Sequence, residues 1–240
     1  MRNEKNNRLM AGNRRQYRRG FQFYQLFIIA FLLTAYSLLL VSGCARTVTQ
    51  IAPSGAEMVV QVTMRGTVEA TANRYFLVVS GTSAYKVQLP LPQPGGTRDE
   101  LLEPGTIPMY GSMEAYFNNY YSTWTGYVIT EPAGYFLGQG PFVFGASSTR
   151  EVLSTTAPSG SFFNFTIRLE QLFGANVPDI IYFDILTVPW VTGAEKLPAD
   201  HLMMSNYVSK IAGTELTIND DPDSSVPSSL DLNKVVVKIQ

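Results

Sequence analysis

The chain has very little cysteine and histidine, with one of each in 240 residues, Cys44 and His201. A single cysteine excludes an intrachain disulfide. One histidine and one cysteine cannot supply the usual ligand set of a zinc site. Most nucleophilic triads need a histidine as base, and no nucleophile-elbow motif accompanies His201, which follows Pro198-Ala199-Asp200 in a polar stretch. We therefore expect His201 to be a solvent-exposed loop residue.

Other motifs that carry chemistry are also missing. No glycine-rich phosphate loop precedes a helical pattern, so nucleotide binding finds no support. No pair of carboxylates stands out for glycoside hydrolysis. Internal repeats and heptads are absent as well. The sequence therefore predicts no cofactor and a protein that is not an enzyme, with a hydrolase as the least favoured functional class.

The net charge of −1 hides two unlike parts. The first 20 residues hold seven basic residues and one acidic residue, a net charge of +6, whereas the rest of the chain holds 11 basic and 18 acidic residues, a net charge of −7. Because phosphates repel an acidic surface, the folded part is not expected to bind nucleic acid or anionic lipid. The basic segment is expected to stay on the cytoplasmic side during membrane insertion.

The chain has one long apolar run, residues 21–41, and it is the only segment long enough to cross a bilayer, which needs about 20 apolar residues. Three interpretations compete: a cleaved signal peptide, a retained transmembrane helix and a lipoprotein signal peptide. An ordinary cleavage site would have small residues in an Ala-x-Ala pattern, which Ser42-Gly43 supplies only in part. Translation could start at Met1 or at Met10, and both starts leave a basic segment before the run.

The end of this run, Leu40-Val41-Ser42-Gly43-Cys44, resembles the lipobox of bacterial lipoproteins. The resemblance implies a signal peptide over residues 1–43, with a basic region at 1–20 and an apolar region at 21–41. It also implies cleavage between Gly43 and Cys44, and lipid chains such as palmitate on Cys44, which would anchor the protein to a membrane of the cell envelope on its extracytoplasmic side. Ala45 replaces the aspartate that retains lipoproteins at the inner membrane, which favours the outer membrane where an organism has one.

Residues 44–55 lack a hydrophobic period and are rich in small and polar residues, so we expect a lipidated tether. From residue 56 the pattern changes to strand-length runs of alternating or β-branched residues, cut by glycine and proline. We expect residues 56–240 to form a single all-β domain, an antiparallel β-sandwich. The expected strands cover residues 58–64, 75–79, 83–89, 112–117, 122–130, 134–137, 141–145, 150–154, 161–169, 180–188 and 234–239.

Helical patterns are few. Short helical turns are expected at residues 98–102, within a proline-rich loop, and at 170–173, before Gly174. A short helix is expected around residues 203–209. The run at 180–188 is apolar on both faces and is expected to be a central strand. Asp184 within it is expected to be an edge-facing or hydrogen-bonded carboxylate and not a catalytic one.

One stretch of the body shows a resemblance of its own. Residues 165–174 (Phe-Thr-Ile-Arg-Leu-Glu-Gln-Leu-Phe-Gly), followed by 181–185 (Ile-Tyr-Phe-Asp-Ile), are similar to sandwiches related to carbohydrate-binding module family 9 and DOMON domains. These sandwiches contain a strand, a short Leu-Gly helix and a further strand in this order. The resemblance implies the fold only, since it assigns no binding residue.

An aromatic-rich segment, residues 109–144, offers a candidate binding site. Aromatic residues surround the polar Asn118-Asn119 in a pattern typical of a hairpin tip, where not all side chains can be buried. Exposed rings on a sheet can stack on sugars or bind a protein. Ordinary core packing is expected to account for most aromatic residues of the segment. The candidate ligand platform consists of Tyr116, Tyr120, Tyr121 and Trp124.

A polar loop near the C-terminus contains Asp220, Asp221 and Asp223, which could bind calcium through carboxylate oxygens. The loop lacks the ligand spacing of an EF-hand and contains Pro222, so a solvated loop is favoured over a metal site.

Taken together, these patterns predict a lipid-anchored envelope protein that binds a glycan or an envelope protein. The alternatives are a structural subunit of an envelope complex, or a protein held by an uncleaved transmembrane helix.

Overall fold

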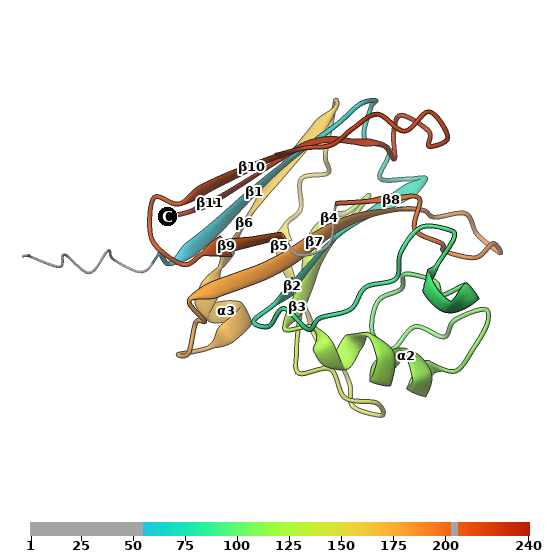
Figure 1. The fold of residues 1–240 in the computed structure, drawn as a ribbon, viewed down its shortest axis with the longest axis horizontal. Helices are drawn as coiled ribbons and strands as arrows, with labels where there is room; N and C mark the ends of the chain where they lie inside the picture. The colour runs from blue at the N-terminus through green and yellow to red at the C-terminus, as the bar shows by residue number, and fades with distance from the viewer. Residues whose placement is uncertain (1–54, 203–205) are drawn as a thin grey trace, which may run out of the picture. The chain divides into compact units, whose positions relative to one another are not determined.

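Two antiparallel sheets of four and seven strands form the domain in a computed structural model that describes residues 55–202 and 206–240 (Figure 1). The predicted antiparallel all-β sandwich is therefore confirmed. The predicted signal peptide, the Gly43/Cys44 site and nearly all of the tether lie outside the described residues. Within the described ranges, no helix is long and apolar enough to span a membrane.

The smaller sheet is built around the first strand of the domain. Val60 at its centre pairs with Val237 on one side and with Phe165 on the other. Ala56, just before this strand, donates its N–H to the carbonyl of Gln240 at 2.6 Å, so the chain enters the domain beside its C-terminus. The strand order is β10 (Glu215–Asn219), β11 (Leu232–Ile239), β1 (Glu57–Met64) and β6 (Phe162–Arg168).

The larger sheet has the order β5-β4-β3-β2-β7-β8, and β9 also pairs with β7. β7 lies between β2 and the pair β8 and β9, so the predicted central position of this apolar strand is confirmed. The strands are β2 (Asn73–Ser80), β3 (Gly126–Glu131), β4 (Gly134–Gln139), β5 (Arg150–Ser154), β7 (Ile180–Pro189), β8 (Asp200–His201) and β9 (Asn206–Ser209).

The core between the sheets follows from the period of two along each strand, which sends alternate side chains to opposite faces. β1 contributes Met58, Val60, Val62 and Met64 to this core. The short helix α3 (Leu169–Phe173) closes one end with Leu169 and Leu172 and stops at Gly174, as expected from the sequence. The larger sheet adds Tyr75, Leu77, Val79, Val128, Leu137, Ile181, Phe183 and Ile185.

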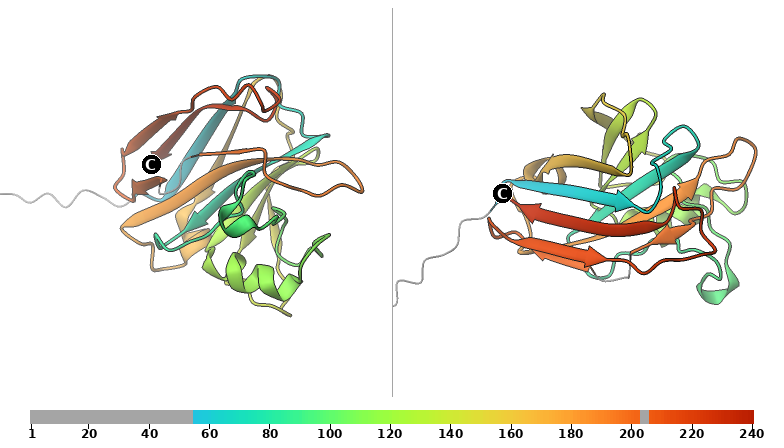
Figure 2. Two further views of the ribbon diagram at one scale, coloured as in Figure 1. Left: turned by 45° about the vertical axis from the view of Figure 1, so that its right-hand side comes forward. Right: turned by 90° about the horizontal axis from the view of Figure 1, so that it is seen from above.

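A second core covers the outer face of the larger sheet. The chain between β2 and β3 forms a long excursion, residues 81–125, which lies against this face on the side away from the smaller sheet (Figures 1 and 2). Its aromatic side chains pack on Phe76 and Val78 of β2 and on Leu186 and Val188 of β7. The excursion contains the 3-10 turn η1 (Pro94–Gly96), the helix α2 (Met113–Asn119) and the 3-10 turn η2 (Tyr121–Thr123).

The strand predicted at 112–117 is wrong, because these residues begin helix α2. The side chain of Ser112 accepts a hydrogen bond from the N–H of Ala115 and caps the helix N-terminus. Tyr116 and Phe117 precede Tyr120 and Tyr121 by four residues each, and this spacing places the rings on one side of a helix. The density of aromatic residues had indicated a strand, but their spacing fits the helical period.

Four smaller predictions are also wrong. Residues 83–89 and 141–145 are extended or irregular but join no sheet ladder, residues 98–102 form no helical turn, and residues 206–209 form β9 instead of a helix. At 83–89 the alternating side chains face the second core, since Tyr85 and Val87 are buried there. The alternating pattern at 83–89 therefore indicated correctly that one side of the segment is buried. It did not indicate a strand, because no strand among the described residues pairs with this segment.

The close packing of the second core can be tested at Gly138 of β4. A Cβ atom there would lie 2.1 Å from Cε1 of Tyr127, whose ring also packs against Phe142 and whose hydroxyl donates to Glu103. Because the ring cannot move away, Gly138→Ala should lower the free energy of unfolding by about 2 kcal/mol. Urea denaturation followed by tryptophan fluorescence measures this change.

The matched control is Gly81→Ala, where the nearest atoms to an added Cβ belong to Phe173 and Pro178 at 3.5 Å, an ordinary contact. Its effect should stay within about 0.5 kcal/mol. Equal stability of the two variants would contradict the described packing of Tyr127.

Candidate functional site

The predicted ligand platform is mostly inside the protein. Tyr116, Tyr121 and Trp124 are 3%, 0% and 3% exposed, and only Tyr120 is half-buried. The prediction of exposed rings at a hairpin tip is therefore wrong for three of the four residues. The physical reason is the fold of the excursion, because α2 and η2 turn these rings toward the outer face of the larger sheet.

The buried rings hold the excursion together through edge contacts and hydrogen bonds. The ring centroids of Tyr121 and Trp124 lie 4.9 Å apart at an interplanar angle of 71°, a favourable edge-to-face arrangement. The indole N–H of Trp124 donates to the carbonyl of Lys86 at 2.7 Å, and the hydroxyl of Tyr116 accepts from the N–H of Glu100 at 2.8 Å. These rings therefore serve the core, as expected for most aromatic residues of the segment.

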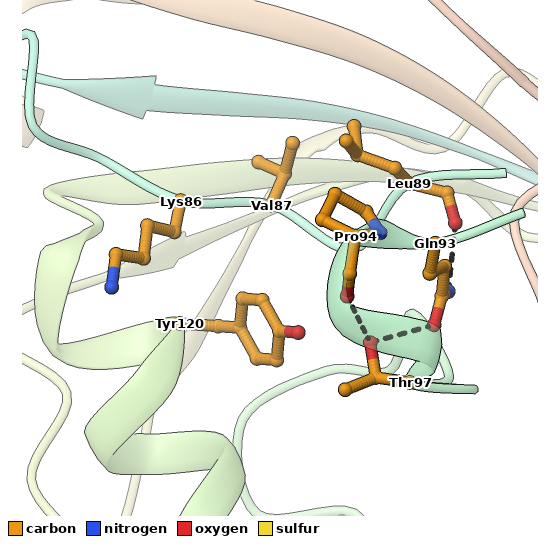
Figure 3. Close-up of a pocket in the computed structure, with 7 residues that line it drawn as sticks. All are labelled: Lys86, Val87, Leu89, Gln93, Pro94, Thr97 and Tyr120. Carbon is orange, nitrogen blue, oxygen red and sulfur yellow. Dashed lines mark hydrogen bonds between the residues drawn. The ribbon is translucent and has the colours of Figure 1, made fainter.

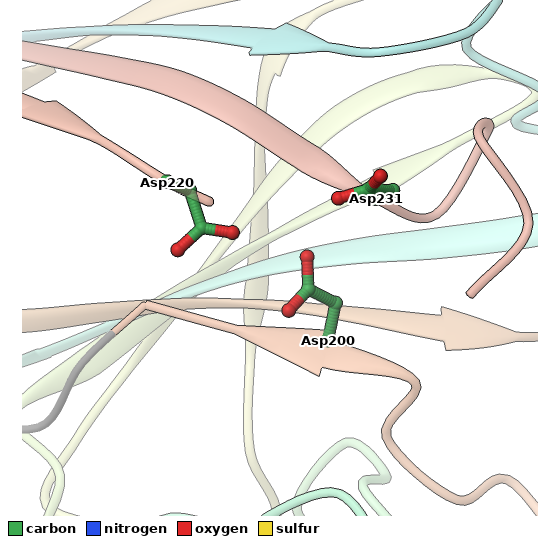
Figure 4. Close-up of side chains that lie close together, drawn as sticks. All are labelled: Asp200, Asp220 and Asp231. Atoms are coloured by element: carbon green, nitrogen blue, oxygen red, sulfur yellow. The ribbon is translucent and has the colours of Figure 1, made fainter. Parts of the chain in front are cut away.

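The predicted calcium loop does not bring its three carboxylates together. Asp221 and Asp223 are exposed, and the carboxylate of Asp223 accepts hydrogen bonds from the N–H and hydroxyl of Ser225. The carboxylate of Asp220 lies instead beside those of Asp200 and Asp231, with one oxygen of each within 4.8 Å of the others (Figure 4). Asp200 begins β8, and Asp220 and Asp231 lie at the ends of the loop that joins β10 to β11, so the cluster depends on how these strands are placed and not on a local sequence pattern.

This acidic cluster, Asp200, Asp220 and Asp231, is tied to the fold by its own hydrogen bonds. Asp200 accepts from the N–H of Leu232 at 2.7 Å, and Asp231 forms an ion pair with the guanidinium of Arg65 at 3.2 Å. Arg65 also donates to the backbone carbonyl of Asp220. Arg65 therefore pairs directly with one of the three carboxylates, that of Asp231, and the cluster keeps an excess of negative charge.

The electrostatic consequence is a raised pKa. Partial burial, followed by the negative charges of Asp200 and Asp231, raises the pKa of Asp220 to about 6 from an ordinary value of 3.8. Burial also raises the pKa of Asp200. Carboxylate oxygens at this spacing are the ligands that calcium and magnesium use, so these three residues could hold such a cation. Arg65 already supplies positive charge at the same place.

A buried carboxylate and the one histidine face each other on the outer side of the larger sheet. Asp184 is fully buried, and its Oδ2 atom lies 3.6 Å from Nδ1 of His201, which is longer than a hydrogen bond. Its Oδ1 atom accepts from the N–H of Ile185 at 2.8 Å, so the predicted hydrogen-bonded carboxylate is confirmed. Burial raises the pKa of Asp184 to about 6.

The prediction for His201 is wrong, since it belongs to β8 and its side chain is 25% exposed. It pairs with Leu186 across the sheet and so faces the same side as Asp184. Burial alone would lower the pKa of His201, but Asp184, together with Asp200 and the backbone of Leu202, raises this pKa overall. An Asp–His pair can transfer protons when a substrate hydroxyl is adjacent, but the hydrogen bonds among residues 55–202 and 206–240 place no nucleophile on His201.

Exposed apolar side chains gather on two loops beside α2. Ser148 donates from its hydroxyl to the carbonyl of Pro104 at 3.2 Å, which holds the two loops next to each other. The ring of Phe144 lies 5.8 Å from that of Phe117 in α2. We define the distal apolar surface as the five exposed residues Ile107, Met109, Tyr110, Val143 and Phe144. Sequence reasoning missed it, although these residues lie in proline- and glycine-rich segments, where loops and exposure are expected.

Comparisons with known proteins give no relative: no family model matches the chain, and neither the curated proteins nor the solved structures contain a match. The resemblances to lipoprotein signal peptides and to carbohydrate-binding module family 9 and DOMON domains therefore stay predictions.

The raised pKa values predict how stability changes with pH. A carboxyl group with a raised pKa binds its proton more tightly in the folded state, so its contribution to stability falls as pH rises from about 4 to about 6. A histidine with a raised pKa contributes below 6.5 and loses this contribution as pH rises through its folded value. The domain should be more stable at pH 5 than at pH 8, as measured by urea denaturation at both values. The groups whose raised pKa values lead to this prediction are Glu103, Asp184, Asp200, Asp220 and His201.

The variant Asp220→Asn measures how much the acidic cluster contributes to this pH dependence of stability. Removing one of the three negative charges should stabilise the domain by about 1 kcal/mol at pH 8, a modest effect because solvent screens a partly exposed carboxylate. It should also flatten the decline between pH 5 and pH 8. The control Asp221→Asn changes an exposed neighbour and should leave the pH profile unchanged. If Asp220→Asn destabilised the domain at pH 8, the inferred repulsion between Asp220 and the carboxylates of Asp200 and Asp231 would be contradicted.

Proposed function

We propose that this protein is a lipid-anchored, non-catalytic protein of the cell envelope that holds a partner protein at its distal apolar surface. The observation that carries the proposal is the exposure of Ile107, Tyr110 and Val143, at 79%, 58% and 57%, on adjoining loops. Clustered exposed apolar side chains are typical of protein interaction sites. A glycan platform has less support, because it depended on exposed rings at residues 116–124.

The location of this surface suits an anchored protein. The chain enters the domain at Gly55, whose N–H donates to the carbonyl of Lys210 at 2.7 Å, next to the C-terminus. α2 and the loops beside it lie away from this entry point, on the outer side of the larger sheet (Figures 1 and 2). A tether of roughly eleven residues from Cys44 reaches at most about 40 Å, so the domain stays near the membrane while its distal end is free for a partner.

Lipidation is tested by Cys44→Ser. Without the thiol no thioether can form, so the variant should lose all incorporation of radiolabelled palmitate and keep its leader, as read from the mass of the intact protein. The control Ser42→Ala preserves a small residue before the cysteine and should keep the label. Unchanged labelling of Cys44→Ser would refute the lipid anchor, and an unlabelled wild-type chain with its leader would indicate the retained transmembrane helix.

Partner binding is tested by placing a photo-crosslinking amino acid at Tyr110 in the full chain in its native membrane. A partner at the distal apolar surface should yield one adduct of defined mass, which Val143→Glu should reduce at least tenfold by burying a charge in the contact. The control position is Tyr207 of β9, which is similarly exposed at 57% but lies outside this surface. Equal adducts at both positions, no adduct at Tyr110, or an adduct with a second copy of this chain would each contradict the proposal.

A further inference from the structure

Two features of the described chain have no part in the proposed function, a small pocket and one open strand edge. The pocket has a volume of about 230 Å³ and lies beside the ring of Tyr120 (Figure 3). The amide of Gln93 in its wall donates to the carbonyls of Leu89 and Asp99, and the hydroxyl of Tyr120 donates to the carboxylate of Asp99. Because these polar groups already bind one another, the pocket indicates no class of ligand, whereas the strand edge indicates its partner.

The open edge belongs to β10, the outermost strand of the smaller sheet, beyond which no strand pairs among residues 55–202 and 206–240 (Figure 1). On its inner side β10 pairs with β11. The N–H of Ile239 donates to the carbonyl of Thr214, and the N–H of Asp220 donates to the carbonyl of Asn233, both at 2.9 Å. Because hydrogen bonding alternates along an antiparallel pair, every second residue of β10 directs its backbone groups away from β11. These outward-facing residues are Glu215, Thr217 and Asn219.

Two other edge strands of five or more residues, β5 and β6, carry features that oppose pairing with another chain. In β6, the N–H of Arg168 is bound by the side chain of Gln171. β5 begins with two charged residues, and its register against β4 shifts. β10 has the sequence Glu-Leu-Thr-Ile-Asn, without proline or a basic residue, and its one charged residue, Glu215, is already paired with Lys238 at 3.0 Å. The edge of β10 is therefore the least protected of the three.

The edge of β10 also leaves apolar surface uncovered. Leu216 and Ile218 pack against the core between the sheets, but both are only partly buried. A further strand beside β10 would remove water from these side chains, which is favourable in proportion to the apolar area covered.

The sequence of β10 is complementary to itself. When two copies pair antiparallel about Thr217, this residue meets its own counterpart. Leu216 then lies opposite Ile218 of the second copy, and Glu215 lies opposite Asn219. Threonine pairs and aliphatic pairs across strands are stabilising, and no like charges are opposed. The three outward-facing residues of each copy would exchange about six backbone hydrogen bonds.

The direction of pairing follows from the acidic residues after β10. Asp220, Asp221 and Asp223 follow the end of the strand. In a parallel pair these carboxylates would lie beside those of the second copy and repel them. In an antiparallel pair the two acidic segments lie at opposite ends, so the charges are separated.

We propose that this chain forms a homodimer by antiparallel pairing of β10 with β10 of a second copy, which joins the two smaller sheets into one. Pairing of five residues per copy buries little area compared with the roughly 1,200 Å² or more of stable complexes, so the dimer is reversible and forms where the chain is concentrated. β10 belongs to the smaller sheet, whereas the distal apolar surface lies beside α2 on the outer side of the larger sheet. The dimer is therefore independent of the proposed partner protein.

The test places a cysteine on the proposed twofold axis, with Thr217→Cys in the full chain reconstituted in phosphatidylcholine vesicles. The two introduced thiols would belong to a hydrogen-bonded pair with Cα atoms about 5.5 Å apart, which suits a disulfide. Mild oxidation with copper phenanthroline should yield a covalent dimer, and the yield should rise with the protein-to-lipid ratio. Peptide mass spectrometry locates the disulfide. The matched control Thr166→Cys, an exposed threonine of edge strand β6, should yield at least fivefold less dimer.

A second variant removes the pairing without an added thiol. Thr217→Pro deletes an outward N–H and keeps the bonds to β11, since proline is tolerated on the solvent side of an edge strand. Energy transfer between copies labelled on lysine with a donor or an acceptor dye should fall at least fivefold. The control Thr166→Pro makes the same change on β6 and should keep the transfer, and urea denaturation checks that both variants are folded.

Three results would overturn the inference: no crosslink with Thr217→Cys, equal crosslinking of the two cysteine variants, or energy transfer that folded Thr217→Pro leaves unchanged. The cysteine variants decide the matter if Thr217→Pro does not fold. A failure here leaves the crosslinking test at Tyr110 unaffected, because the two tests address different surfaces.

Discussion

The need to bury both faces of the larger sheet governs this structure. Along β2, Leu77 and Val79 point to the smaller sheet while Phe76 and Val78 point the other way, and all four are at most 2% exposed. Each such side chain contributes about 1.5–3 kcal/mol only when water is removed from it. A sandwich of two sheets covers one of these faces, so the outer face requires a second cover.

The excursion between β2 and β3 is that cover, and the need to bury the outer face of the sheet determines how the excursion packs. Its aromatic side chains turn inward to pack on the sheet, which explains why Tyr121 and Trp124 are buried in a segment otherwise rich in loops. Its outward side meets solvent, so the features open to ligands lie there or beside it. The distal apolar surface and the pocket at Tyr120 are both consequences of this arrangement.

The sequence predicted the strands whose apolar residues alternate or form a continuous run. Predictions based on the composition of a segment, and not on the spacing of its residues, were wrong. β1, β6, β7 and β11 were found because side chains alternate along them or are apolar on both faces. α2 was missed because aromatic density suggested a strand, although Tyr116 and Tyr120 stand four residues apart. The acidic cluster was misassigned because proximity in sequence favoured Asp221, whereas the actual neighbours come from other strands and loops.

The sequence by itself determined the fold class and the inward-facing positions, because the period of a strand depends only on neighbouring residues. It also defined the candidate lipobox at Cys44. The tertiary structure alone decided that Asp184 faces His201, that Asp220 joins Asp200, and that Tyr120 lines a pocket. The physical reason is that these contacts join segments distant in the chain, whose meeting depends on strand order and on the path of the excursion, and no local pattern encodes either.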